Sequence, residues 1–333
     1  MEKLDFQYTD SSFIELGQIE NAVKVDIEIG KYKVASNDFE LVINEKYWNE
    51  NFDKGSLFYV VGTEYGGLIG PKEVDTATHN ITFRGQSLRG LLEKEYVQPP
   101  DGYTHLVLKG TAEACLKKVI GNRFGEMIVV EKSDTNIDVN YQIRDMNLLD
   151  AIERFLLKAS IPSKLEIKFY NKQMHVKAVP IRDISEYVQL DDSYNLQMIV
   201  GEAKEGFNHI LALGNGELLD RIRINLFKQE DGTWGDHEVY KGFDRKTFKF
   251  EDPNAKDIEE LKQRAIESCE EKNGSDSIKV TFGADEAELF DIVGAKEKIT
   301  GISFKEKITQ KILSGSIKNF KADVKIEHKV GDN

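Results

Sequence analysis

The sequence is poor in the residues that build disulfide, redox and metal chemistry. Its 333 residues include two cysteines, Cys115 and Cys269, six histidines and six prolines. Both cysteines fall in segments predicted to be helical, so we expect two small buried hydrophobic side chains rather than a disulfide or a redox pair. The histidines are scattered, with no two within five residues of each other, which excludes HExxH and other local metal pairs. We therefore expect no metal and no cofactor.

Basic charge is also scarce relative to acidic charge. The chain has 45 Lys and Arg against 58 Asp and Glu, a net charge of -13. Such a balance repels phosphate, so we expect no stable binding of nucleic acid and no adsorption to an anionic membrane. Apolar runs are only a few residues long, and the first ten residues lack a signal-peptide hydrophobic region. We expect folding in a cytosol.

Local signatures of catalysis are absent as well. The sequence has no GxSxG, and neither cysteine has the flanking residues of a thiol protease. Gly214 and Gly216 lack the third glycine of a dinucleotide loop and precede a strand-like segment, which indicates a hairpin turn. The cluster Trp234–Glu238 (WGDHE) is typical of a glycine-rich hairpin loop that carries solvated charges. These absences favour a structural or binding protein over an enzyme.

What the sequence does contain is strand periodicity, beginning in its first 96 residues. Apolar residues alternate with polar ones, and short runs are separated by turn residues, which predicts a small β-barrel over 1–96. The residues expected to share core-facing positions are Val23, Val25, Ile27 and Ile29, then Phe39, Leu41 and Ile43, then Leu57, Tyr59 and Val61, and finally Ile81 and Phe83.

The period changes over residues 97–180, which predicts an α+β module. One helix is expected to begin after Thr111 as its N-cap and to end at Gly121. A second is expected to begin after Asn147 and to end before Pro162. A hairpin follows, with strands around 165–169 and 174–178 and a turn at 171–173.

Strand character returns in the second half. We predict a second β-barrel from residues 181–227 together with 284–333, interrupted by a small helix-containing insertion at 228–283. The helix of that insertion is expected to have Asp252 as N-cap, Pro253 at its first position, an apolar stripe from Ile258 to Cys269, and Gly274 at its end. The fold class is thus mainly β with α+β insertions and two small barrels.

Two stretches resemble a known family. Residues 55–100 are similar to the siphovirus ReqiPepy-type tail-hub family, whose members are phage tail-tip or baseplate hub proteins. The matching positions are Gly67–Gly70, Ile81–Phe83, Gly85, Arg89–Leu92 and Pro99–Pro100. Residues 290–331 look like the final barrel of that family through Asp291, Val293 and Gly294, although the usual Gly-Asp order is missing.

The resemblance implies a structural subunit at the virion tail tip, assembled in the host cytoplasm. It implies a homotrimer that closes the distal tail tube. The expected partners are the tail-tube or distal-tail protein, the tape-measure protein, and a spike, fibre or lysin. Arg84 and Arg89 would lie near a barrel rim and pair with carboxylates of a neighbouring subunit, or else be solvated surface charges. The glycines expected to allow tight barrel turns through positive φ are Gly66, Gly67, Gly70, Gly85 and Gly90.

Two functions of other classes stay open at this point. A tail-associated hydrolase of cell wall or capsule would have to build its site into the hub itself, because the chain ends soon after the last predicted strand. A carbohydrate-binding tail-tip module would need stacking platforms, and Trp48 and Trp234 are the two tryptophans in the sequence.

Overall fold

The computed structural model describes most of the chain, and the described residues are mainly β. They are 4–186, 189–190, 197–201, 206–218, 220–255, 257–273, 277–282, 287–296 and 303–330. The chain divides into two compact units, one of Met1–Gln197 with Val280–Val330 and the other containing Met198–Lys279. The predicted mainly β class with helical insertions is confirmed.

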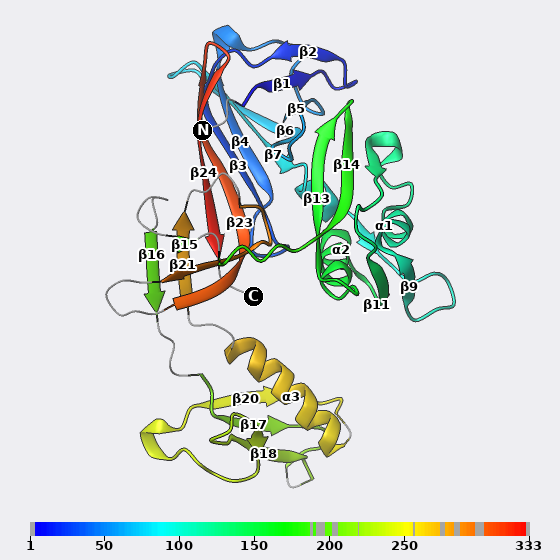
Figure 1. Ribbon diagram of the computed structural model, residues 1–333, viewed down its shortest axis with the longest axis vertical. Coiled ribbons are helices and arrows are strands. Elements are labelled where there is room, and N and C mark those ends of the chain that lie inside the picture. The colour runs from blue at the N-terminus through cyan, green and yellow to red at the C-terminus, as the bar shows by residue number, and fades with distance from the viewer. Residues whose placement is uncertain are drawn as a thin grey trace. The chain divides into compact units, whose positions relative to one another are not determined.

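A large, mostly antiparallel sheet dominates the first unit (Figure 1). Its neighbour order is β16-β21-β24-β23-β3-β4-β7-β6-β5-β1-β2, with β22 beside β23 and β15 beside β22. The described strands do not close into a barrel. The bounds are β1 Phe6–Thr9, β2 Glu15–Gln18, β3 Ala22–Gly30, β4 Asp38–Asn44, β5 Leu57–Val60, β6 Gly66–Asp75, β7 Asn80–Ser87, β15 Gln189–Leu190, β16 Gln197–Gly201, β21 Ser277–Phe282, β22 Ile292–Lys296, β23 Ser303–Lys318 and β24 Lys321–Val330.

In strand β3 the predicted alternation of buried and exposed residues agrees with the structure only in part. Ile27 and Ile29 face the core as expected, but Val23 is 57% exposed and Ala22 is buried in its place. The register with β23 shifts here: Gly315 is opposite Val25, but Ile317 is opposite Ala22. The extra residue of this β-bulge reverses the faces of the strand. Val23 was therefore predicted on the wrong face.

The two ends of the chain share this sheet. Strand β23 pairs with β24 on one side and with β3 on the other, where Leu313 lies opposite Ile27. Leu313 and Ile27 are fully buried in a cluster that also includes Phe58 and Phe83. The predicted second barrel gave β23 and β24 to a separate domain, whereas here they extend the sheet of the first β region.

Residues 88–180 form helices and small sheets that pack beside the large sheet (Figure 1). Both predicted helices are confirmed: Thr111 accepts a hydrogen bond from the N–H of Ala114 at the start of α1, and Asn147 accepts one from Leu149 at the start of α2. The predicted hairpin is confirmed as β13 and β14. The bounds are β8 Tyr96–Val97, β9 Leu106–Thr111, α1 Ala112–Ile120, β10 Ile128–Val130, β11 Asp138–Ile143, β12 Met146–Asn147, α2 Leu148–Leu157, β13 Ser163–Tyr170 and β14 Gln173–Pro180, with the 3-10 helices η2 Gly90–Lys94 and η3 Gly125–Met127. A further 3-10 helix, η1 Glu45–Tyr47, lies between β4 and β5.

The second unit is a four-stranded sheet with one helix packed on it. Its order is β19-β18-β17-β20, and β17 runs parallel to β20. The predicted insertion began at residue 228, but β17 and β18 belong to this sheet, so the helix-containing unit begins earlier. The bounds are β17 His209–Leu213, β18 Arg223–Lys228, β19 Trp234–Gly235, the 3-10 helix η5 Gly242–Asp244, β20 Thr247–Glu251 and α3 Ile258–Asn273.

Helix α3 begins later than the sequence predicts. Asp252 accepts a hydrogen bond from the N–H of Asn254 in a turn, and Asp257 instead accepts from the N–H of Glu260 at the helix start. Asp257 is therefore the residue that satisfies a first-turn donor of α3. The predicted end at Gly274 lies outside the described residues. Cys115 in α1 and Cys269 in α3 are buried and form no disulfide, as expected.

Candidate functional site

Arg89 is the most unusual of the residues singled out by the sequence. It follows β7 at the start of η2, between the buried residues Leu88 and Gly90, and its side chain is only 1% exposed. Nε and Nη2 donate to Glu64 Oε2 at 3.2 and 2.9 Å, and Nη2 also donates to the Leu165 carbonyl at 3.1 Å. The expectation that Arg89 pairs with a neighbouring subunit at a rim is wrong in this structure, because the chain itself supplies its partners.

Arg84 lies within β7, on the face opposite to the buried Phe83. It is opposite Glu40 of β4 in the register, and its Nε donates to Glu40 Oε2 at 2.9 Å. Its Nη1 donates to Glu73 of β6, also at 2.9 Å. The side chain is still 49% exposed. A role for Arg84 in an interface stays a prediction.

Four of the glycines singled out in this stretch lie in strands, Gly66, Gly67 and Gly70 in β6 and Gly85 in β7, whereas Gly90 begins the 3-10 helix η2. Of these five glycines Gly66 alone has a positive φ, at 156°, so the prediction of positive φ at Gly67, Gly70, Gly85 and Gly90 is wrong. A Cβ on Gly85 would lie 2.1 Å from the Leu68 carbonyl oxygen, and one on Gly90 would lie 2.0 Å from that of Asn37. Close approach of another backbone is the reason for glycine here. Added Cβ atoms at Gly66, Gly67 and Gly70 would likewise lie under 3 Å from a neighbouring atom.

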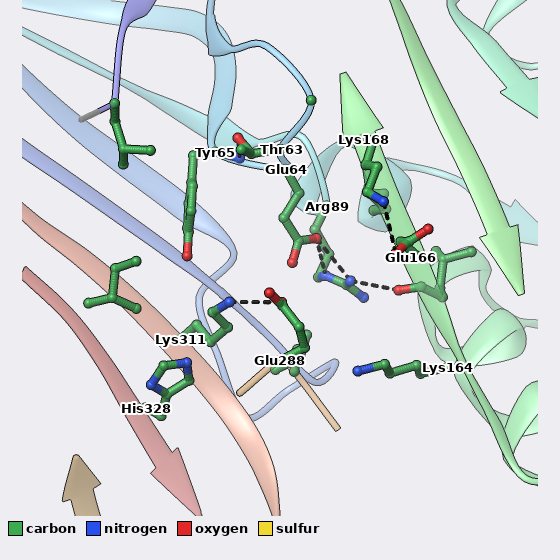
Figure 2. Close-up of a pocket in the computed structure, with 16 residues that line it drawn as sticks. Thr63, Glu64, Tyr65, Arg89, Lys164, Glu166, Lys168, Glu288, Lys311 and His328 are labelled. Carbon is green, nitrogen blue, oxygen red and sulfur yellow. Dashed lines mark hydrogen bonds and ion pairs between the residues drawn. The ribbon is translucent and has the colours of Figure 1, made fainter. Parts of the chain in front are cut away.

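A pocket of about 290 Å³ lies beside Arg89 (Figure 2). Its walls come from the turn between β5 and β6, from β13, from the segment before β22, and from β23 and β24. These segments are far apart in the sequence, and they present acidic and basic side chains to one space. The charged residues of the lining are Glu64, Arg89, Lys164, Glu166, Lys168, Glu288 and Lys311.

Lys164, which lines this pocket, forms a buried ion pair with Asp291. Lys164 Nζ donates to Asp291 Oδ1 at 2.7 Å, and the two side chains are 9% and 0% exposed. Arg182 also donates to Asp291, as does the backbone N–H of Glu288. Burial acts to raise the pKa of Asp291, but the hydrogen bond from Arg182 and the charge of Lys164 outweigh it and lower the pKa below its usual value. Asp291 is thus held as a carboxylate.

Lys311 enters the pocket from β23. Its Nζ donates to Glu288 Oε2 at 2.8 Å and lies 5.6 Å from the centre of the Tyr65 ring (Figure 2). Burial acts to lower the pKa of Lys311, but Tyr65 and Glu288 outweigh it and raise the pKa. In a strand, residues two positions apart share a face, so Lys311 is on the same face as the buried Leu313 and Ile317. This spacing could have indicated from the sequence that a charged side chain enters the core.

Sequence reasoning missed most of this cluster. Glu64, Glu153, Lys164 and Lys311 were not singled out, and Asp291 was noted only as part of a family pattern. They come together only when β13, α2 and the C-terminal strands pack beside β7. These ion pairs between cations and carboxylates link three regions of the first unit: the strands around β7, the helix-containing residues 88–180, and the C-terminal strands.

The remaining candidates of the sequence are structural. The Gly214–Gly216 segment connects antiparallel strands β17 and β18, as predicted for a hairpin. Trp234 and Gly235 form β19, which pairs with β18. The described part of the chain contains no group of three His, Cys, Asp or Glu residues placed to hold a metal ion. Within those same residues, no helix is both long and apolar enough to cross a membrane.

Comparison with known proteins identifies the fold. The sequence matches no known protein-family profile and no curated protein. The 43 kDa tail protein of prophage MuSo2 from Shewanella oneidensis has TM-score 0.58 and 11% identity, covering 99% of this chain and 98% of its own. Prophage tail protein gp18 of Listeria monocytogenes EGD-e has TM-score 0.53 and 13% identity, covering 99% and 94%. A tail protein of Neisseria meningitidis MC58 has TM-score 0.53 and 13% identity, covering 100% and 97%. This chain has the fold of prophage tail proteins.

Proposed function

We propose that this protein is a structural subunit of the tail of a phage, a prophage or a phage-tail-like particle. The observation that carries the proposal is the structural likeness to three prophage tail proteins, which extends over 99–100% of this chain and 94–98% of theirs. A likeness limited to one small sheet would be common to many unrelated folds. A likeness that extends over both units supports a structural role in a tail, like that of these proteins.

The more specific proposal is a tail hub of the ReqiPepy type at the tail tip. A homotrimer would close the distal end of the tail tube. A ring of this kind needs heterologous contacts, in which one face of a subunit meets a different face of the next. The partners would be the tail-tube or distal-tail protein, the tape-measure protein, and a spike, fibre or lysin.

The protein is further proposed to have no catalytic activity of its own. The described charged groups of the pocket are engaged in ion pairs, with one another or with Asp291, rather than arranged as a nucleophile and its base. Incubation with purified peptidoglycan and with casein should release no products. Turnover that disappears in the Glu64→Gln or Glu288→Gln variant would instead support the tail-associated hydrolase.

The carbohydrate-binding alternative finds less support. Trp48 Nε1 donates to the Phe52 carbonyl, and Trp234 Nε1 donates to Glu270. Lysines lie over both rings, Lys72 at 4.9 Å and Lys228 at 5.6 Å from the ring centres. Both tryptophans are therefore engaged within the chain, whereas a sugar platform needs an open ring face.

Electron microscopy of assembled tails tests the hub directly. Density for this protein at the distal end, in three copies, is the expected result. A position along the tube shaft, or a copy number other than three, would contradict the hub and leave the broader tail assignment standing. Absence from purified tails would contradict both.

A further inference from the structure

One buried cation faces two buried carboxylates beside α2. Arg89 is 1% exposed, Glu64 is 12% exposed and Glu153 is 10% exposed. Glu64 takes two of the guanidinium hydrogen bonds, and Leu165 takes another. Only Nη1 remains for Glu153, and it lies 3.9 Å from Glu153 Oε1. Neither of these two atoms has a hydrogen-bond partner among the residues that the structure describes.

The other charged groups around Glu153 do not supply the missing counter-charge. Asp150 lies one turn earlier on α2 and disfavours a second carboxylate, although it accepts from Arg154. Glu93 of η2 faces Arg89 as a third carboxyl and accepts a hydrogen bond from Asn37. Lys31, before the turn between β3 and β4, is the remaining cation. Carboxyls thus outnumber cations in this buried space.

Glu153 also connects two regions of the first unit. Its Oε2 accepts a hydrogen bond from the backbone N–H of Tyr32 at 3.1 Å. Tyr32 belongs to the turn between β3 and β4, whereas Glu153 belongs to α2. The protonation state of Glu153 therefore affects the contact between α2 and the turn that joins β3 to β4 in the large sheet.

We propose that protonation of Glu153 controls this contact, which is tight when the carboxyl is neutral and loosens when it ionises. In the neutral state Arg89 keeps its two hydrogen bonds to Glu64, and Glu153 adds no negative charge to this space. In the ionised state the same space holds an additional buried negative charge, which only movement of α2 or entry of water relieves. This proposal does not depend on the hub assignment, because all the residues involved belong to one chain.

The titration behaviour of Glu153 supports this. Burial raises the pKa of Glu153 from 4.5 to about 7, against the opposing effects of Arg89 and the Tyr32 N–H. Because the folded-state pKa lies above the unfolded value, this stabilisation is complete below pH 4.5 and is lost as the pH rises through 7. Between pH 5 and 8.5 the folding equilibrium constant should fall by on the order of 70-fold from this group alone.

The experiment compares the wild type with Glu153→Gln, which keeps the shape and the acceptor for Tyr32 but cannot ionise. Glu126→Gln, at an exposed position of η3, is the matched control. Urea unfolding is measured from pH 5 to 8.5. Hydrogen–deuterium exchange is measured for α2 and for residues 31–35 at pH 5 and 8.5, corrected for intrinsic rates. The carboxyl carbon of Glu153 is titrated by NMR in the wild type.

We expect wild type and Glu126→Gln to lose stability and exchange protection at α2 as the pH rises, and Glu153→Gln to lose neither by a comparable amount. The Glu153 resonance should titrate near pH 7. Parallel stability curves for wild type and Glu153→Gln would overturn the proposal. So would unchanged protection at α2, or a Glu153 carboxyl that titrates near 4.5.

Discussion

Lys164 Nζ lies 2.7 Å from Asp291 Oδ1, although 127 positions separate the two residues. The pair joins β13 to the segment that leads into β22, and both side chains are buried. Asp291 also holds Arg182 and the N–H of Glu288. One carboxylate therefore organises the connection between the helix-containing part and the C-terminal strands.

Replacing this carboxylate should be costly. Asp291→Asn keeps the shape but leaves the ammonium of Lys164 buried without its anion, so we expect a loss of about 3–5 kcal/mol in the free energy of unfolding. Lys164→Met should cost less, because Asp291 keeps Arg182. Urea unfolding measures both. Asp145→Asn, in the exposed ion pair with Arg144, is the control and should change little. Equal losses in Asp145→Asn and Asp291→Asn would contradict the role given to the buried pair.

The close backbone approaches at Gly85 and Gly90 give a second prediction. Gly85→Ala and Gly90→Ala should each destabilise the protein by about 1–3 kcal/mol, because the added methyl group overlaps a carbonyl oxygen. Gly125 is the comparison: it has a φ of 56° but no atom within 4 Å of an added Cβ. Thermal melts of the three variants separate overlap from backbone strain. A larger shift for Gly125→Ala than for the other two would contradict the packing explanation.

Features that depend on a few neighbouring residues, such as helix ends, could be predicted from the sequence. Thr111, Asn147 and Gly121 define helix ends through hydrogen bonds within a few residues, so α1 and α2 were found from their caps. The start of α3 was predicted too early in the sequence, because Asp252 and Asp257 are both aspartates that can cap a helix. The structure shows that Asp257 is the one that accepts a hydrogen bond from a backbone N–H of the helix. The mistake at Val23 has the same character, since the bulge that exposes it depends on the distant strand β23.

Arg89 shows why the site itself could not be predicted. Nothing near it in the sequence distinguishes it from Arg84, which lies five positions earlier, in β7. The difference comes from partners at Glu64, Glu153 and Leu165, which approach only after α2 and β13 pack beside the end of β7. Burial of a charge is a property of the packed unit, whereas strand periodicity is a property of a few consecutive residues.

The two cysteines give a third prediction. Burial raises the pKa of the Cys115 thiol, and it raises that of Cys269 to about 11. Because the thiolate is the reactive form, neither should react with an aromatic disulfide reagent in the native protein at pH 8. After denaturation in guanidinium, two thiols per chain should react. A native thiol that reacts as fast as the denatured ones would contradict the burial described for α1 or α3.

Arg84 allows the assembly proposal to be separated from folding. It is exposed and joined to Glu40 and Glu73 by surface ion pairs, which contribute little to stability because water screens them. Arg84→Ala should therefore unfold at nearly the same urea concentration as the wild type. If Arg84 pairs with a neighbouring subunit, the same variant should lose incorporation into tails. Lys72→Ala, on the adjacent strand β6 and paired with Asp53, is the matched control for loss of a surface charge. Normal incorporation of both variants would remove Arg84 from the proposed interface, and equal loss in both would indicate a general charge effect rather than a specific contact.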